Sequence, residues 1–119
     1  MSRILVVDDE PDLRYVLRRV FERAGHEVAD AGQGVAALAA VHSSPPDLVV
    51  TDMMMPVMSG VELIRRLRAD PATAPLPILA VTGDAHLALG ADAVLRKPWR
   101  SQQLLAAANA LIAQKADRP

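Results

Sequence analysis

The sequence lacks cysteine, has one residue each of Phe, Tyr and Trp, and contains no long apolar run. Without cysteine, disulfides, thiolate metal sites and thiol chemistry are excluded. No apolar segment approaches the roughly 20 residues that a membrane-spanning helix needs. The first apolar run, Ile4–Val7, is followed at once by Asp8-Asp9-Glu10, so the N-terminus does not resemble a signal peptide. We therefore expect a soluble, cytoplasmic protein with no membrane partner.

The net charge is also small, because 13 basic residues nearly balance 14 acidic ones in a chain of 119 residues. A near-neutral chain lacks the basic surface that binds nucleic acid or anionic membranes, so we expect no nucleic-acid partner. The length suits one domain, residues 1–119, with a core of Val, Leu, Ile, Ala and Met.

Short apolar segments alternate with helical patterns along the chain. The expected strands are Ile4–Val7, Glu27–Ala31, Leu48–Asp52, Ile78–Val81 and Ala93–Leu95. Helical patterns begin at Pro11, Val35, Ser59 and Ser101. Such alternation predicts an α/β fold, a doubly wound five-stranded parallel sheet with the flavodoxin-like strand order 2-1-3-4-5.

Local signals predict details of three helices. The first helix should bury the apolar face formed by Leu13, Val16, Leu17, Val20 and Phe21. Its opposite side carries Arg14, Arg18 and Arg19, for which exposure to solvent is the simplest expectation. Ser59 and Glu62 have capping-box spacing at the third helix, and Ser101 is expected to cap the last one.

Reactive polar residues follow four of the expected strands. They are Asp8 and Asp9 after the first strand, Asp52 at the third, Thr82 after the fourth and Lys97 after the fifth. Ligands bind at the carboxyl ends of strands in open α/β sheets, so these side chains should converge. Three carboxylates without nearby His or Cys favour Mg²⁺ or Mn²⁺. With Lys97 and Thr82 to hold a phosphate, the set can support in-line phosphoryl transfer to Asp52.

Four motifs along nearly the whole chain resemble those of the receiver domains of two-component response regulators. They are Val6-Val7-Asp8-Asp9-Glu10, Asp52-Met53-Met54-Met55-Pro56, Val81-Thr82-Gly83 and Lys97-Pro98. The resemblance implies a signalling switch or phosphorelay component rather than an enzyme. Such a domain catalyses only its own phosphorylation and dephosphorylation. Asp52 would accept the phosphoryl group from a histidine kinase or a histidine phosphotransfer protein, and a downstream protein, unknown from the sequence, would read the switch.

The same resemblance implies a role for each site residue. Asp9, Asp52 and the Met54 backbone carbonyl would bind Mg²⁺ directly, and Asp8 would bind it through water. Lys97 would pair with the phosphoryl group, and Thr82 would hydrogen-bond to it after switching. Lys97-Pro98 would be a cis peptide, and the arginine face of the first helix would be a docking surface for the kinase.

The chain departs from the family pattern in two places that concern output. Val94 stands where the family usually has Tyr or Phe, and valine cannot make the inward swing of that aromatic residue. Thr82 and Lys97 are only 15 residues apart, which leaves too little chain for a normal helix between the fourth and fifth strands. We expect that helix to be truncated or absent and the neighbouring surface to be remodelled.

Several alternatives remain open at the level of sequence. The acidic residues could be helix caps, Thr82 could simply end a strand, and Lys97 could be solvated. A pseudo-receiver would share the fold without phosphorylation. A Mg²⁺-dependent phosphohydrolase would need a proton carrier where Met54 stands, and a flavin-binding domain would need aromatic residues that are scarce here. The favoured interpretation is a stand-alone receiver.

Overall fold

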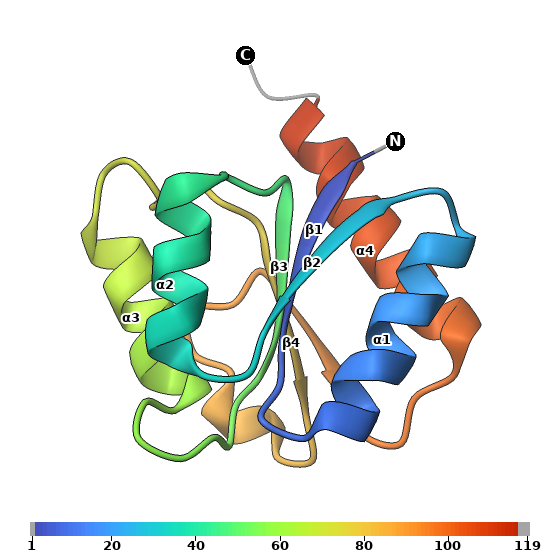
Figure 1. The fold of residues 1–119 in the computed structure, drawn as a ribbon, viewed down its shortest axis with the longest axis horizontal. Helices are drawn as coiled ribbons and strands as arrows, with labels where there is room; N and C mark the ends of the chain where they lie inside the picture. The colour runs from blue at the N-terminus through green and yellow to red at the C-terminus, as the bar shows by residue number, and fades with distance from the viewer. Residues whose placement is uncertain (1, 117–119) are drawn as a thin grey trace.

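The computed structural model describes residues 2–116 and contains one parallel β-sheet (Figure 1). Its strands are β1 (Arg3–Val7), β2 (Glu27–Ala31), β3 (Leu48–Asp52), β4 (Ile78–Thr82) and β5 (Ala93–Arg96). The strand order is β2-β1-β3-β4-β5, and all four pairings are parallel. The predicted doubly wound order is therefore confirmed, and it places the chain reversal between β1 and β3.

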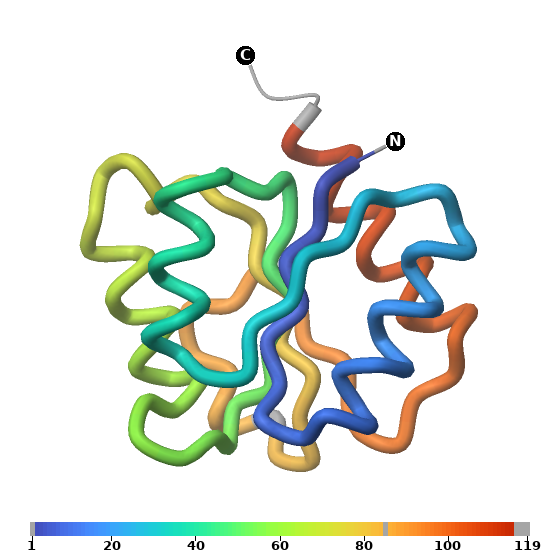
Figure 2. The backbone as a smooth tube through the Cα atoms, viewed as in Figure 1, coloured from blue at the N-terminus to red at the C-terminus, as the bar shows by residue number. Residues whose placement is uncertain are grey.

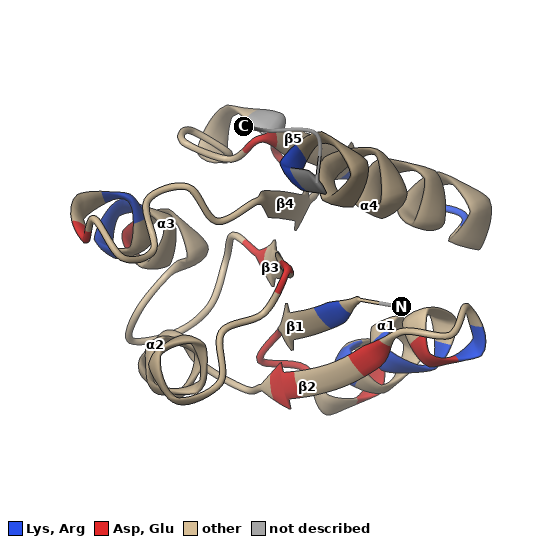
Figure 3. Cartoon of the chain, turned by 90° about the horizontal axis from the view of Figure 1, so that it is seen from above, with Lys and Arg blue, Asp and Glu red and all other residues tan. Residues whose placement is uncertain are grey.

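Four α-helices cover the two faces of the sheet (Figures 1 and 3). They are α1 (Pro11–Arg23), α2 (Gly34–Ser43), α3 (Gly60–Ala69) and α4 (Ser101–Ala116). Figures 1 and 3 show α1 and α4 on one side and α2 and α3 on the other. In Figure 3 the charged residues colour α1 and α3, whereas α2 has none. None of the helices described is long and apolar enough to cross a bilayer.

The inner strands β1, β3 and β4 each supply two hydrophobic cores at once. In β1, Ile4 and Val6 pack with residues of α1 and α4, whereas Leu5 and Val7 pack with residues of α2 and α3. Successive side chains of a strand point to opposite faces, so a strand covered on both sides must be apolar throughout. This explains why β1, β3 and β4 read as unbroken apolar runs.

The connection between β4 and β5 contains no α-helix. A single 3₁₀ turn, η1 (Ala85–Leu87), replaces it (Figure 2). Leu87, Ala88 and Ala91 pack in the core on the α2–α3 side, where they join Ala80 of β4. Val94 lies beside Ala80 in the sheet and is 41% exposed. The predicted shortening of this crossover is confirmed, and the sheet surface at Val94 is left partly uncovered.

The structure corrects two details of the helices. Val16, expected in the buried face of α1, is 46% exposed, whereas Leu17 and Phe21 of the same helix are buried in the core shared with α4. Ser101 is the first residue of α4 rather than its cap. The Arg100 N–H instead donates to the Gln103 side chain at 2.9 Å, so an amide three residues into the helix performs the capping.

One of the two hydrogen bonds of the predicted capping box forms at the start of α3. The Ser59 hydroxyl accepts a hydrogen bond from the Glu62 N–H at 3.2 Å, as expected for an N-cap. The Glu62 carboxylate does not return to Ser59. It pairs with Arg65 and with Arg66 on the surface of the helix, where opposite charges three and four residues apart face each other.

Candidate functional site

Asp52 is the last residue of β3, the central strand of the sheet. This strand pairs with β1 on one side and with β4 on the other, so Thr51 lies beside Val7 and Asp52 beside Val81. Every residue of β3 is buried. A one-residue slip would move every side chain of β3 to the opposite face, so residues packed in one core would have to fit the other. The packing of β3 therefore holds the Asp52 carboxylate at the carboxyl edge of the sheet.

The loop after β1 brings two more carboxylates to Asp52. One oxygen of each of Asp8, Asp9 and Asp52 lies within 4.8 Å of the other two. Burial raises the pKa of Asp8 above its ordinary value of 3.8, and the charges of Asp52 and Asp9 raise this pKa further. The Glu10 N–H, which donates to Asp8 Oδ1, and the Lys97 charge offset part of the rise. The cluster thus carries excess negative charge.

The two carboxylate oxygens of Asp52 have different surroundings. Oδ1 accepts a hydrogen bond from the Met53 N–H at 2.8 Å and lies 3.5 Å from Lys97 Nζ. Oδ2 accepts no hydrogen bond and joins no ion pair with any residue in the described part of the chain. One oxygen is therefore held in place, while the other is free to bind an incoming group.

Thr82 ends β4 and Lys97 follows the neighbouring strand β5, but the two differ in how they face the cluster. The Lys97 N–H donates to the Thr82 carbonyl at 2.9 Å, and the peptide that follows, Lys97–Pro98, is cis. The buried Thr82 hydroxyl is bonded to the backbone of Asp84, from whose N–H it accepts at 3.1 Å. The structure thus places the Lys97 ammonium beside Asp52, but it turns the Thr82 hydroxyl toward Asp84.

The segment between β3 and α3 passes very close to Asp52. The Gly60 N–H donates to the Met53 carbonyl at 2.9 Å. A Cβ atom at Gly60 would lie 2.2 Å from the Asp52 carbonyl oxygen, so only glycine fits there. The Met54 side chain is exposed, and no hydrogen bond among residues 2–116 uses its carbonyl. That carbonyl is available as a further oxygen ligand.

Arg14 belongs to the surroundings of the site, although its helical position suggested a solvent-exposed residue. Its Nη1 donates to the Asp8 carbonyl at 2.8 Å, and its Nε lies 3.7 Å from Asp30 Oδ2. Arg19 matches the expectation and is exposed. Helical periodicity could not reveal the contact, because it depends on how α1 docks against the loop after β1. A carbonyl acceptor leaves no signal in the sequence.

The donor atoms of the cluster fit a hard divalent cation. The convergent carboxylates of Asp8, Asp9 and Asp52 offer oxygen ligands only, which Mg²⁺ and Mn²⁺ prefer. Burial raises the pKa of Asp8 most, and the nearby charges of Asp52 and Asp9 raise this pKa further. A bound cation would offset the charge of all three carboxylates. The structure brings together the three predicted carboxylates and Lys97, in agreement with a metal and phosphate site.

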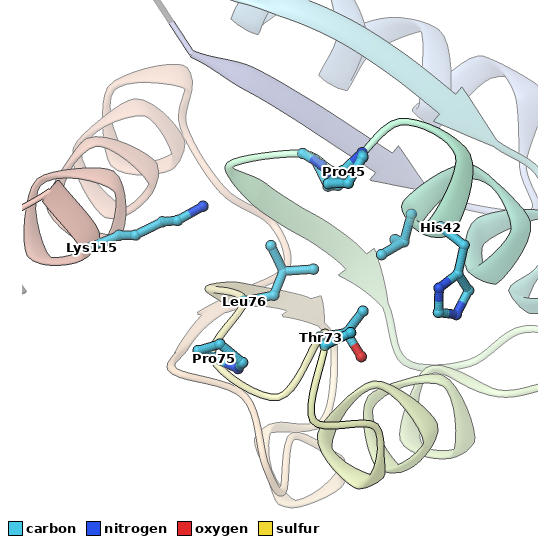
Figure 4. A pocket seen from close by; sticks show the side chains of 9 residues that line it. His42, Pro45, Thr73, Pro75, Leu76 and Lys115 are labelled. Carbon is cyan, nitrogen blue, oxygen red and sulfur yellow. The ribbon is translucent and has the colours of Figure 1, made fainter.

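A separate hollow of about 490 Å³ lies at the opposite edge of the sheet. Figure 4 shows His42, Pro45, Thr73, Pro75, Leu76 and Lys115 among the residues that line it. Its two basic side chains already have carboxylate neighbours, since His42 Nε2 lies 3.8 Å from Asp70 and Lys115 Nζ lies 3.6 Å from Asp47. This hollow contributes no residue to the acidic cluster.

Comparison with known protein families decides what kind of domain carries this site. The family model of the response regulator receiver domain matches residues 4–109. The chain belongs to this family. As a receiver domain it takes part in phosphorylation-dependent two-component signalling, in a regulatory role. The resemblance drawn from the four motifs is thereby confirmed.

Individual relatives support the assignment. The DNA-binding response regulator MtrA of Mycolicibacterium smegmatis is 38% identical over 122 residues, which cover 99% of this chain and 54% of MtrA. A response regulator from Chloroflexus aurantiacus is 33% identical with a TM-score of 0.89, over 94% of this chain and 98% of that one. TrrA from Thermotoga maritima, solved in complex with Mg²⁺-BeF, is 32% identical with a TM-score of 0.85, over 93% of this chain and 99% of TrrA. The receiver described here thus spans about half the length of MtrA.

Proposed function

We propose that Asp52 is the phosphoacceptor of this receiver domain and that its donor is the phosphohistidine of a histidine kinase or of a histidine phosphotransfer protein. One observation carries the proposal above all. Asp52 stands at the end of the buried central strand with one oxygen free, while its other oxygen is 3.5 Å from Lys97 Nζ. A lysine beside a carboxylate, with two further acidic residues to hold a cation, can support phosphoryl transfer to that carboxylate.

The transfer is a displacement at phosphorus. An oxygen of Asp52 forms a bond to the phosphorus atom, and the bond from phosphorus to the donor imidazole nitrogen breaks. The electron pair of that bond stays on the nitrogen, which becomes neutral or takes up a proton from solvent. Lys97 compensates the charge that the phosphoryl oxygens bring to the site. The product is an acyl phosphate on Asp52.

The ion proposed for this site is Mg²⁺, with Mn²⁺ as a substitute. We propose that Asp9, Asp52 and the Met54 carbonyl bind it directly and that Asp8 binds it through water. When bound, the ion supplies positive charge that neutralises the carboxylates and the phosphoryl oxygens. The chain's own residues contribute position, since the Glu10 N–H fixes Asp8 and the Met53 N–H fixes Asp52.

Thr82 would complete the site only after a rotation. Its hydroxyl is bonded to Asp84, and it must leave this partner to donate to a phosphoryl oxygen. With Val94 in the place of the usual aromatic residue, the accompanying rearrangement around β5 is expected to be small. The reader of the switch is proposed to be a downstream protein in the cytoplasm, and beyond its own phosphorylation and dephosphorylation the domain would catalyse no reaction.

Intact mass measurement after incubation with a small phosphodonor and Mg²⁺ tests the proposal. Wild-type protein should gain about 80 Da, the mass of one PO₃ group, and Asp52→Asn should gain nothing. Asp70→Asn is a suitable control, because Asp70 lies near His42 at the far edge of the sheet, and it should behave as wild type. Equal incorporation in Asp52→Asn and wild type would refute the assignment.

A pseudo-receiver that acts as an interaction module without phosphorylation is the second candidate function. The exposed Val94 and the single turn η1 favour it, because both change the surface next to the switch. The two functions differ in their response to Mg²⁺. A phosphoacceptor should show a saturable change in the fluorescence of Trp99, whose side chain lines a hollow together with Asp8 and Lys97, whereas a pseudo-receiver should show none.

A further inference from the structure

Arg14 connects three segments that meet behind the acidic cluster. It lies in the second turn of α1 and is mostly buried, with 23% of its side chain exposed. Its guanidinium donates to the Asp8 carbonyl at 2.8 Å and lies 3.7 Å from Asp30 at the end of β2. It also packs against the bare backbone of Gly32, where a Cβ atom would lie 3.1 Å from Nη1. The side chain is therefore confined on several sides.

The bond to the Asp8 carbonyl acts on both acidic residues of the loop. Asp8 is held by its N–H, which donates to Ala31, and by Oδ1, which accepts from the Glu10 N–H. Its carbonyl belongs to the rigid peptide plane that joins Asp8 to Asp9. The Arg14 bond fixes the orientation of that plane and, with it, the direction in which the Asp9 side chain leaves the backbone.

The charge of Arg14 is compensated on the side away from the cluster. Asp30 lies next to Arg14 and also pairs with Arg18 at 3.2 Å. A free guanidinium this close to a metal site would repel a divalent cation. The ion pair with Asp30 weakens this repulsion, while the hydrogen bond to the Asp8 carbonyl is retained.

We infer that Arg14 is a positioning residue for the divalent-cation site, acting through the Asp8–Asp9 peptide and with its charge balanced by Asp30. The inference rests on the proposed function, because it assumes that the acidic cluster binds Mg²⁺. Residues that orient metal ligands typically contribute about 10- to 100-fold to metal affinity. Arg14 differs from a direct ligand, since it has no contact with the ion.

A Mg²⁺ titration of the full chain tests the role, with Trp99 fluorescence and the Mg²⁺-dependent rise in melting temperature as independent readouts. In Arg14→Ala the dissociation constant for Mg²⁺ should rise about tenfold. Arg18→Ala is the matched control, because Arg18 pairs with Asp30 but does not contact Asp8. Its Mg²⁺ affinity should equal that of wild type.

The sign of the change separates positioning from a simple effect of charge. If Arg14 were only a nearby cation, its removal would strengthen Mg²⁺ binding, and if it only stabilised the fold, the melting temperature without Mg²⁺ would fall while the affinity stayed the same. Either result overturns the inference. Arg14→Lys keeps the charge and the aliphatic stem but not the planar fork. It should still fold if Arg14→Ala does not, and wild-type affinity in it would also overturn the inference.

A wild-type protein without any saturable response to Mg²⁺ would overturn the metal site itself, and the role of Arg14 with it. Normal binding in wild type together with unchanged binding in Arg14→Ala would overturn only the role of Arg14. The wild-type titration therefore tells the failure of the proposed function apart from the failure of this inference.

Discussion

Replacing Asp8 with asparagine should stabilise the metal-free protein and remove most of its stabilisation by Mg²⁺. Asp8 is buried, with 2% of its surface exposed, and its pKa is raised by burial and by the neighbouring carboxylates. Asparagine has the same shape and keeps an oxygen that can accept the Glu10 N–H. The substitution therefore removes a buried charge without opening a cavity or leaving the Glu10 donor unpaired.

The separation of the carboxylates sets the size of the effect. At 4.8 Å, two unit charges repel each other by about 1 kcal/mol in water and by about 3.5 kcal/mol at the effective dielectric constant near a protein surface. Asp8 faces two such neighbours, and the attraction of Lys97 cancels roughly one of them. We expect Asp8→Asn to raise the free energy of unfolding without metal by about 1 to 3 kcal/mol. In a domain of this size that corresponds to about 3 to 6 °C in melting temperature for each kcal/mol.

Thermal unfolding with and without Mg²⁺ measures both halves of the prediction. At a Mg²⁺ concentration of 100 times its dissociation constant, wild type should gain about 2.7 kcal/mol, and Asp8→Asn should gain much less. Asp8→Asn should therefore be more stable than wild type without Mg²⁺, and this advantage should shrink or reverse when Mg²⁺ is added. A metal-free Asp8→Asn protein less stable than wild type would refute the reasoning, because the charge of Asp8 would then contribute more through its hydrogen bond than it costs through repulsion. Asp70→Asn, at the far edge of the sheet, should show no such exchange.

Three further predictions follow from the same structure. Because folding raises the pKa of Asp8, its contribution to the stability of the metal-free protein should be largest at low pH and should be lost as pH rises through the raised pKa. The unfolding free energy of wild type should therefore fall relative to that of Asp8→Asn between pH 4 and pH 7, and a difference that stayed constant or changed the other way would contradict this. Gly60→Ala forces a Cβ atom to 2.2 Å from the Asp52 carbonyl oxygen, so it should lower the unfolding free energy by about 2 kcal/mol or more and reduce phosphorylation. Gly83→Ala, with nothing within 4 Å of its Cβ, should do neither. Val57 has a φ of 68° and is almost fully exposed, so Val57→Asn should stabilise the protein in denaturant unfolding by about 1 kcal/mol, whereas Val35→Asn on α2 should not.

Most of the architecture could be predicted because the parallel sheet leaves a strong pattern in the sequence. The run Leu48–Asp52 is apolar up to its last two residues, since both faces of β3 are covered. Once the strands were assigned, the topology alone placed Asp8, Asp52 and Lys97 at one edge. The short spacing between Thr82 and Lys97 was enough to predict the loss of a helix, because the number of residues limits what can fit between two strands.

Features that depend on how the elements dock could not be predicted in the same way. The periodicity of α1 placed Val16 in the core and Arg14 in solvent. In the folded chain Val16 is exposed and Arg14 donates to the Asp8 carbonyl. The hydroxyl of Thr82 has two possible partners, and the sequence does not say that it chooses Asp84. The roles of the individual site residues remain predictions that experiments on this protein must test.

The most direct test of the central claim is to locate the phosphoryl group on the chain. Protein phosphorylated in the presence of Mg²⁺ is treated with borohydride, which reduces an aspartyl phosphate to homoserine, and its peptides are then sequenced by mass spectrometry. We predict homoserine at position 52, between Thr51 and Met53, and none when Mg²⁺ is removed by a chelator. Homoserine at position 8 or 9, or homoserine that still forms without Mg²⁺, would contradict the assignment of Asp52 as the phosphoacceptor.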